Sequence, residues 1–130
     1  MPKHLALVTL VVRNYDEAKT WYTENLGFSL IEDTDLGNGK RWLVVAPGTG
    51  TGFLLAQAKN ETERAAIGNQ TGGRVAFFLH TDNFARDHAA MTVKGIKFRE
   101  KPRHEPYGIV AVFEDLYGNL FDLIELANGA

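Results

Sequence analysis

The stretch Leu5–Gly27, LALVTLVVRNYDEAKTWYTENLG, changes its hydrophobic period halfway along. Leu5–Val12 is almost continuously apolar and rich in β-branched residues, which predicts a buried strand. Asn14 then occupies a favourable N-cap position, and Glu17 follows three residues later, as in a capping box. Apolar residues recur every three or four positions until Gly27, a favourable helix end. The stretch therefore predicts a strand that leads directly into an amphipathic helix.

The residues after this helix predict three further strands. Phe28–Thr34 alternates apolar and polar side chains, and Gly37-Asn38-Gly39 is a typical hairpin turn that leads into Arg41–Ala46. Gly52–Ala58 predicts one more strand, after a loop rich in glycine and threonine. The first half of the chain therefore predicts a β-α-β-β-β module over residues 4–58.

The second half repeats this order after a linker, residues 59–73, which contains a short predicted helix at Asn60–Gly68. A second helix is capped by Asp82 or Asn83 and ended by Gly95. The predicted strands of this module are Arg74–Thr81, Ile96–Glu100, Tyr107–Glu114 and Leu120–Leu126. Two βαβββ modules in tandem, residues 4–58 and 74–127, thus predict an α+β fold in a single domain over residues 1–130. Each module leaves one sheet face to be covered by the other module or by a partner chain.

The composition of the chain limits the kinds of partner that we expect it to bind and indicates a compartment. The chain has 130 residues and a formal net charge of −2, so it lacks the basic field typical of nucleic-acid binding. The apolar run Leu5–Val12 is much shorter than the roughly 20 residues of a spanning helix, and no membrane partner is expected. The chain has no cysteine, which excludes disulfides and thiolate chemistry and suits a cytoplasmic location.

Several segments resemble those of one large superfamily. They are residues 11–18 (VVRNYDEA), Trp21-Tyr22, Leu26-Gly27-Phe28, and Glu114–Leu123 (EDLYGNLFDL), with its acid, its Gly-Asn turn and a strand that bears a further acid. On these segments, which span nearly the whole chain, the sequence resembles the vicinal oxygen chelate superfamily of glyoxalase I, bleomycin-resistance proteins and extradiol dioxygenases. The resemblance implies paired βαβββ modules with curled mixed sheets that form a U-shaped cavity. It also implies a homodimer, with modules paired within one chain or swapped between two.

The resemblance further implies where a divalent metal would bind, on one inward side chain from each of four strands. These positions fall on Leu7, on the strand Phe53–Ala56, on Ala76 and on Asp122. Only Asp122 carries a donor atom, whereas a divalent metal needs three or four protein ligands. We therefore expect no metal site and no cofactor.

Two residues are candidate catalytic groups, Asp122 and His80. Asp122 lies in an otherwise apolar strand, where a carboxylate is unfavourable unless it is paired or faces a cavity. His80 shares a strand face with Ala76 and Phe78, so it is a shifted ligand, a general base, a hydrogen-bond donor to a ligand, or simply a surface histidine. Either residue could act as a general base without a metal.

The candidate ligand-binding residues lie on the strands and loops that the resemblance places around the cavity. Arg41 and Trp42 are adjacent on one strand, so one of them faces the cavity and the other faces away. The loop Arg103–Gly108 is expected at the cavity mouth. The full set of candidates is Thr9, Arg41, Trp42, Phe78, Arg103 and Tyr107.

Two functions from different classes remain open at this point. The first is a metal-free protein that binds a small organic molecule in a cavity at a dimer interface. The second is a divalent-metal-dependent lyase, isomerase or dioxygenase of the same superfamily. The number of metal donors separates them, and it favours the binding protein.

Overall fold

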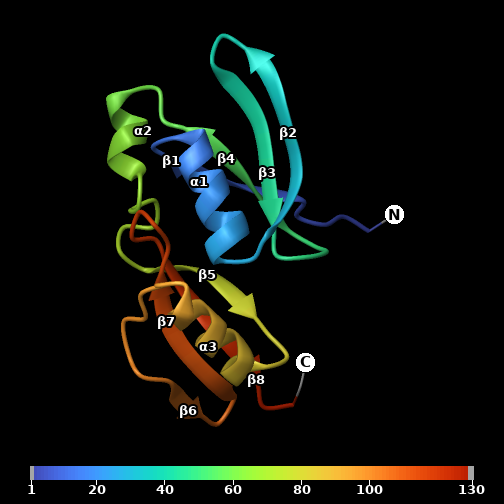
Figure 1. Cartoon of the computed structure of the whole chain (residues 1–130), viewed down its shortest axis with the longest axis vertical. Coiled ribbons are helices and arrows are strands. Elements are labelled where there is room, and N and C mark those ends of the chain that lie inside the picture. The colour runs from blue at the N-terminus through green and yellow to red at the C-terminus, as the bar shows by residue number, and fades with distance from the viewer. Residues whose placement is uncertain (1, 129–130) are drawn as a thin grey trace. The chain divides into compact units, whose positions relative to one another are not determined.

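The computed structural model describes residues 2–128, and the chain forms two compact units that divide between Ile67 and Gly68. Figure 1 shows each unit as a small sheet with helices packed beside it. The two units are described in turn. In residues 2–128, no helix has both the length and the apolar character that crossing a membrane would demand.

The first unit contains a four-stranded sheet in the order β1-β4-β3-β2, with β1 and β4 parallel and the other pairs antiparallel. Its elements are β1 (Leu7–Val12), α1 (Tyr15–Thr20), the π-helical turn η1 (Trp21–Asn25), β2 (Ser29–Gly37), β3 (Lys40–Ala46), β4 (Gly52–Gln57) and α2 (Glu61–Ala66). The predicted strand, helix and hairpin order of this module is confirmed.

The helix α1–η1 begins and ends where the sequence predicts. The side chain of Asn14 accepts a hydrogen bond from the backbone N–H of Glu17 at 2.9 Å, and Gly27 adopts the left-handed conformation (φ 78°) after the last turn. The reciprocal half of the capping box does not form, because the Glu17 carboxylate instead pairs with Arg13. The fully buried Tyr22 anchors the helix to one face of the sheet, edge-on to Phe53 with 5.7 Å between ring centroids.

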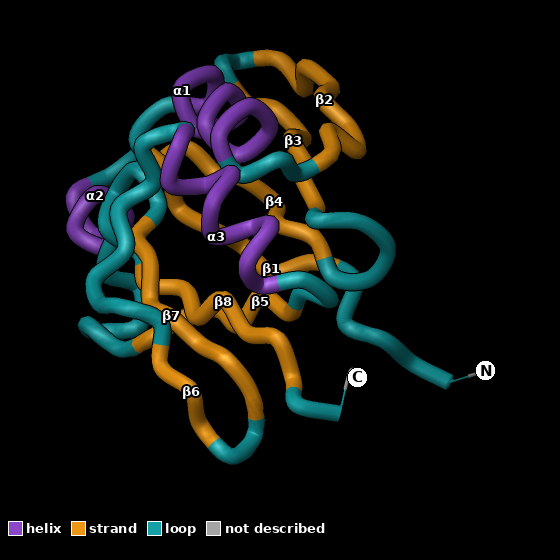
Figure 2. Tube along the Cα trace, turned by 60° about the horizontal axis from the view of Figure 1, so that its bottom comes forward, coloured by secondary structure: helices purple, strands orange, loops and turns teal. Residues whose placement is uncertain are grey.

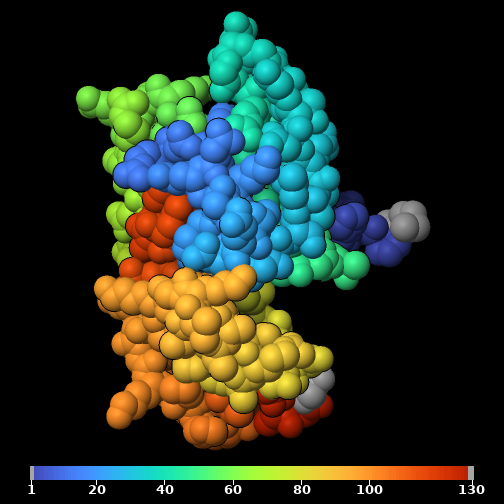
Figure 3. Space-filling model, in the orientation of Figure 1, coloured from blue at the N-terminus to red at the C-terminus, as the bar shows by residue number. Residues whose placement is uncertain are grey.

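The hairpin between β2 and β3 turns through Asn38 (φ 56°) and Gly39 (φ 78°), as a two-residue hairpin with two left-handed residues requires. β2 is the edge strand of this sheet, and all of its residues are exposed. Figure 3 shows its cyan surface along the outer edge of the unit. The exposed residues of β2 include three large apolar side chains, Leu30, Ile31 and Leu36.

The second unit repeats the architecture, with sheet order β5-β8-β7-β6 and a parallel β5/β8 pair. Its elements are β5 (Val75–His80), α3 (Phe84–Val93), β6 (Arg103–Glu105), β7 (Gly108–Glu114) and β8 (Leu120–Leu126). Figure 2 shows α3 beside the strands of this unit. Asn83, one of the two predicted caps, accepts a hydrogen bond from the backbone N–H of Arg86 at 3.0 Å.

The predicted strand Ile96–Glu100 is wrong, because this segment forms only one isolated bridge, between Phe98 and Phe113. The carboxylate of Glu100 accepts a hydrogen bond from the backbone N–H of Val112. In a continuous strand, a backbone carbonyl would accept that hydrogen bond instead. Pro102 then lacks an N–H of its own. Regular pairing therefore starts only at β6, and Arg103–Glu105, predicted to be a loop, is a short strand.

The Gly-Asn turn before β8 is held by one carboxylate. Asp115 is buried and accepts hydrogen bonds from the backbone N–H groups of Tyr117 and Asn119 and from the Asn119 amide, at 2.8–2.9 Å. This turn fixes where β8 starts, and therefore which of its residues face α3. Phe121 lies on the α3 side, stacked on Phe113 with 4.9 Å between centroids, so its neighbour Asp122 lies on the other side.

Candidate functional site

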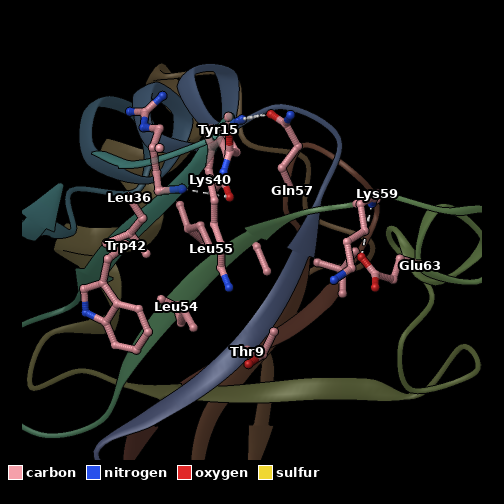
Figure 4. A pocket seen from close by; sticks show the side chains of 17 residues that line it. Thr9, Tyr15, Leu36, Lys40, Trp42, Leu54, Leu55, Gln57, Lys59 and Glu63 are labelled. Carbon is pink, nitrogen blue, oxygen red and sulfur yellow. Dashed lines mark hydrogen bonds between the residues drawn. The ribbon is translucent and has the colours of Figure 1, made fainter. Parts of the chain in front are cut away.

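The open face of the first unit, opposite α1, contains a hollow of about 910 Å³. Its floor is formed by alternate residues of three neighbouring strands, which Figure 4 shows from close by. The hollow is also bordered by the β2–β3 turn and by the segment that leads into α2. The floor residues are Thr9 and Val11 from β1, Trp42 from β3, and Leu54 and Ala56 from β4.

Among the candidate ligand-binding residues, Trp42 has a side chain that faces this hollow. Leu43 and Val45 are fully buried on the α1 side of the sheet, so strand alternation places Trp42 and Val44 on the open face. Trp42 keeps 37% of its surface exposed, and its ring borders the hollow in Figure 4. Thr9 pairs with Leu54 of β4, and Leu54 pairs with Val44 of β3. Thr9 therefore lies on the same face of the sheet as Trp42. The structure therefore brings two predicted ligand-binding residues, Thr9 and Trp42, together.

Arg41 borders the hollow, but its guanidinium is bound elsewhere. It forms ion pairs with Asp33 and Asp16, each at 2.8 Å, and its charge lies 5.1 Å from the centroid of the Tyr15 ring. The hydrogen bond from Arg41, and next that from Lys19, lowers the pKa of the Asp33 carboxyl to about 2. The two carboxylates in turn raise the pKa of Arg41. This network ties β2, β3 and α1 together, and the predicted role of Arg41 in ligand binding stays a prediction.

The second unit places Asp122 beside Phe78. Asp122 pairs with Phe78 of β5 on one side and with Val112 of β7 on the other, on the sheet face opposite α3. Phe78 is 62% exposed, so an aromatic ring stands open to solvent next to the carboxyl group. His80 is exposed and lies two paired positions further along β5, opposite Ile124. The structure thus places both predicted catalytic residues on one face but not side by side.

One carboxyl oxygen of Asp122 is exceptional. Its Oδ1 is buried, and among residues 2–128 nothing donates a hydrogen bond to it. Burial raises the pKa of this carboxyl, and Arg103 opposes the rise while Glu100 adds to it. Such a group can accept a hydrogen bond from a bound molecule, or take up a proton more readily than an ordinary aspartate.

The two remaining candidates lie around the β6–β7 hairpin. Arg103 on β6 is held by Glu100 at 3.0 Å and Glu105 at 2.6 Å. Tyr107 lies in the turn after β6 and is 50% exposed. Arg103 also interacts with the Tyr107 side chain, so the two candidates belong to one network around the hairpin.

A model of the Glyoxalase/Bleomycin resistance protein/Dioxygenase superfamily matches residues 3–123. The chain belongs to this superfamily. An uncharacterized protein from Shewanella frigidimarina is 50% identical over 129 residues, which are 97% of this chain and 96% of that protein. Among solved structures, UcmS2 shares 32% identity with a TM-score of 0.82, over 95% of this chain and 98% of that one. TnmS3, an antibiotic binding protein from Streptomyces sp. CB03234, shares 28% identity with a TM-score of 0.76, over 97% and 98% of the two chains.

The residues of this glyoxalase-superfamily chain do not fit a divalent metal. Of the four positions at which metal-dependent members hold their ion, Leu7, the β4 segment Phe53–Ala56 and Ala76 offer only hydrocarbon side chains. Asp122 is one donor where three or four are needed. Within the described part of the chain, no three His, Asp or Glu side chains are grouped as metal ligands would be.

Sequence reasoning missed the polar rim of the first unit's hollow. Lys40 follows the hairpin turn at the start of β3, and Lys59 follows β4 just before the α2 cap Asn60. Both border the hollow, together with Gln57 and Glu63. Neither lysine belongs to a motif, and the only available signal was their position at strand ends that the fold brings to one face.

Proposed function

We propose that this protein binds a small organic molecule, without a resident metal, in the mainly apolar hollow of its first unit. The observation that carries the proposal is Trp42, a large aromatic side chain left partly exposed at the floor of a hollow in the first unit. An exposed aromatic in a concave, mainly apolar setting is typical of a small-molecule site.

The size of the hollow supports this proposal. Pockets for small organic ligands have volumes of about 300–1,000 Å³, and the hollow of about 910 Å³ lies in this range. Its floor offers Val11, Leu54 and Ala56 for contact, with Thr9 as a single hydroxyl. Such a floor favours recognition by shape and apolar contact, with few hydrogen bonds.

One similar solved structure supports binding as the activity. TnmS3 is described as an antibiotic binding protein, and its likeness extends over nearly the whole of both chains. The metal-free part of the proposal rests on the residues themselves, since Leu7 and Ala76 place hydrocarbon at two of the positions where metal-dependent members of the superfamily hold donors.

We further propose that the ligand lies at the interface of a homodimer. β2, an edge strand, exposes Leu30, Ile31 and Leu36, and β5 exposes Phe78. Exposed apolar patches often mark a protein–protein interface. A second copy of the chain would cover these strands and close the cavity.

Titration with N-phenylnaphthylamine, an uncharged dye that fluoresces in apolar sites, tests the binding proposal. We expect saturable binding in the micromolar range, and elemental analysis of the same purified sample should find no stoichiometric Zn, Ni, Mn or Fe. The mass in solution should be that of two chains. Absence of saturable dye binding would contradict the ligand site, a stoichiometric metal would contradict the metal-free state, and a monomeric mass would contradict the dimer interface.

A further inference from the structure

We propose that the hollow of the first unit selects organic anions, in which an apolar body lies on the floor and a single carboxylate or sulfonate lies between Lys40 and Lys59. This inference rests on the proposed function, because it names the chemistry of the molecule bound there. It follows from the charges around the hollow, considered one by one.

Two of the charged residues that border the hollow are already engaged. The Arg41 guanidinium is bound by Asp33 and Asp16. The Glu63 carboxylate accepts the backbone N–H of Lys59 at 3.1 Å and the side-chain amide of Asn60 at 3.3 Å, at the start of α2. These groups stabilise the fold around the hollow and are not free to bind a ligand.

The two lysine ammonium groups remain. Among residues 2–128, no carboxylate lies within ion-pair distance of the ammonium group of Lys40 or Lys59. Figure 4 shows both side chains reaching into the hollow, Lys40 from the start of β3 and Lys59 from the segment after β4. Two like charges that converge on one space repel each other, and an anion placed between them relieves that repulsion.

The surroundings strengthen this effect. The floor below the lysines is apolar, with Val11, Leu54 and Ala56, and lysine stems lie readily along such surfaces while the ammonium stays at the rim. A bound apolar body would displace water from the floor and lower the local dielectric, so each ammonium would attract the anion more strongly than a fully solvated lysine does. The position of the anionic group at the rim lets the rest of the molecule contact Trp42.

A matched pair of dyes tests the proposal. Anilinonaphthalenesulfonate carries one sulfonate, and N-phenylnaphthylamine has the same ring system without it. Both are titrated into the wild-type chain, the double variant Lys40→Gln/Lys59→Gln, and the control variant Lys94→Gln. Lys94 is the C-cap residue of α3 and does not border the hollow. Circular dichroism shows whether each variant is folded, which exposed lysine-to-glutamine changes should not prevent.

We expect the double variant to bind the sulfonate dye roughly fivefold to tenfold more weakly, as the loss of two partly exposed ion pairs predicts. Affinity for the uncharged dye should change less than about twofold, and Lys94→Gln should leave both affinities unchanged. Added salt should weaken binding of the sulfonate dye to the wild type more than to the double variant.

Equal effects on the two dyes, no effect on the sulfonate dye, or an equal effect from Lys94→Gln would each overturn the anion preference. In all three cases binding of the uncharged dye would still stand, and with it the proposed function. If neither dye bound, the proposed function would fail and this inference with it.

Discussion

Replacement of Trp42 by alanine is the most direct test of the ligand site. A tryptophan side chain buries about 150–250 Å² when it is fully covered, and Trp42 has 37% of its surface open. A ligand that covers the ring therefore removes roughly 55–90 Å² of the protein's apolar surface from water. At about 25 cal/mol per Å², this contact is worth about 1.5–2 kcal/mol of binding free energy, so Trp42→Ala should weaken binding roughly tenfold to thirtyfold.

The assay uses the two tryptophans of the chain, Trp21 and Trp42. In a Trp21→Phe background, Trp42 is the one indole fluorophore, and energy transfer from it to bound N-phenylnaphthylamine reports binding at this ring. Affinity is then measured from the dye's own fluorescence in wild type and Trp42→Ala. Val93→Ala serves as the matched control, because Val93 on α3 is 88% exposed and does not border the hollow.

Two results would refute this reasoning. An affinity of Trp42→Ala within twofold of the wild type would show that the dye does not cover the ring. A loss of affinity in Val93→Ala as large as that in Trp42→Ala would show that the dye binds exposed apolar side chains in general. Most of the Trp42 surface is covered in the folded chain, so Trp42→Ala should also lower the urea midpoint. Dye affinities are therefore compared without urea, where circular dichroism confirms that the variant is folded.

Two further predictions concern the buried and paired carboxylates. Because Arg41 and Lys19 lower the pKa of Asp33 to about 2, its ionised form stabilises the fold above the unfolded-state pKa, and this contribution is lost as the pH falls through about 2. Asp33→Asn should therefore lower the free energy of unfolding by about 1 kcal/mol at pH 7, and urea denaturation should show the difference vanish near pH 2. Burial raises the pKa of Asp122, so its protonated form is the one that the fold favours, and stability is lost as the pH rises through the raised pKa. Asp122→Asn should thus be more stable than the wild type at pH 7, and the difference should disappear below the unfolded-state pKa of about 4. A less stable variant at pH 7 would contradict the missing hydrogen-bond partner.

The fold was largely predictable because local signals and tertiary packing agree. The caps at Asn14, Asn60 and Asn83 each accept a hydrogen bond from the third residue on, as the sequence indicates. Gly27 and Gly95, which mark the same corner in the two modules, have nearly equal left-handed φ angles of 78° and 82°. Each of these signals depends only on neighbouring residues, which is why it can be read from the chain.

The failures occurred where a distant side chain decides the outcome. The segment around Phe98 alternates as a strand would, but the Glu100 carboxylate takes a backbone donor of β7. Alternation likewise shows that Arg41 and Trp42 face opposite sides, without saying which is inside. That choice depends on Asp16 and Asp33, which lie 25 and 8 residues away from Arg41 in the chain.

One face of the first sheet packs against α1, and the other borders the hollow. Because of this separation, a residue on the open face can be replaced without disturbing the packing that stabilises the fold. The α1 face holds Tyr22, Leu43 and Leu55, all fully buried, together with the ion pairs of Arg41 at its edge. Strand alternation keeps the open-face residues out of that packing. A leucine at position 7, where a metal-dependent member would hold a donor, therefore costs the core little and makes the open face more apolar. Chemistry on that face can therefore change with single substitutions that leave the packed face of the sheet unaltered.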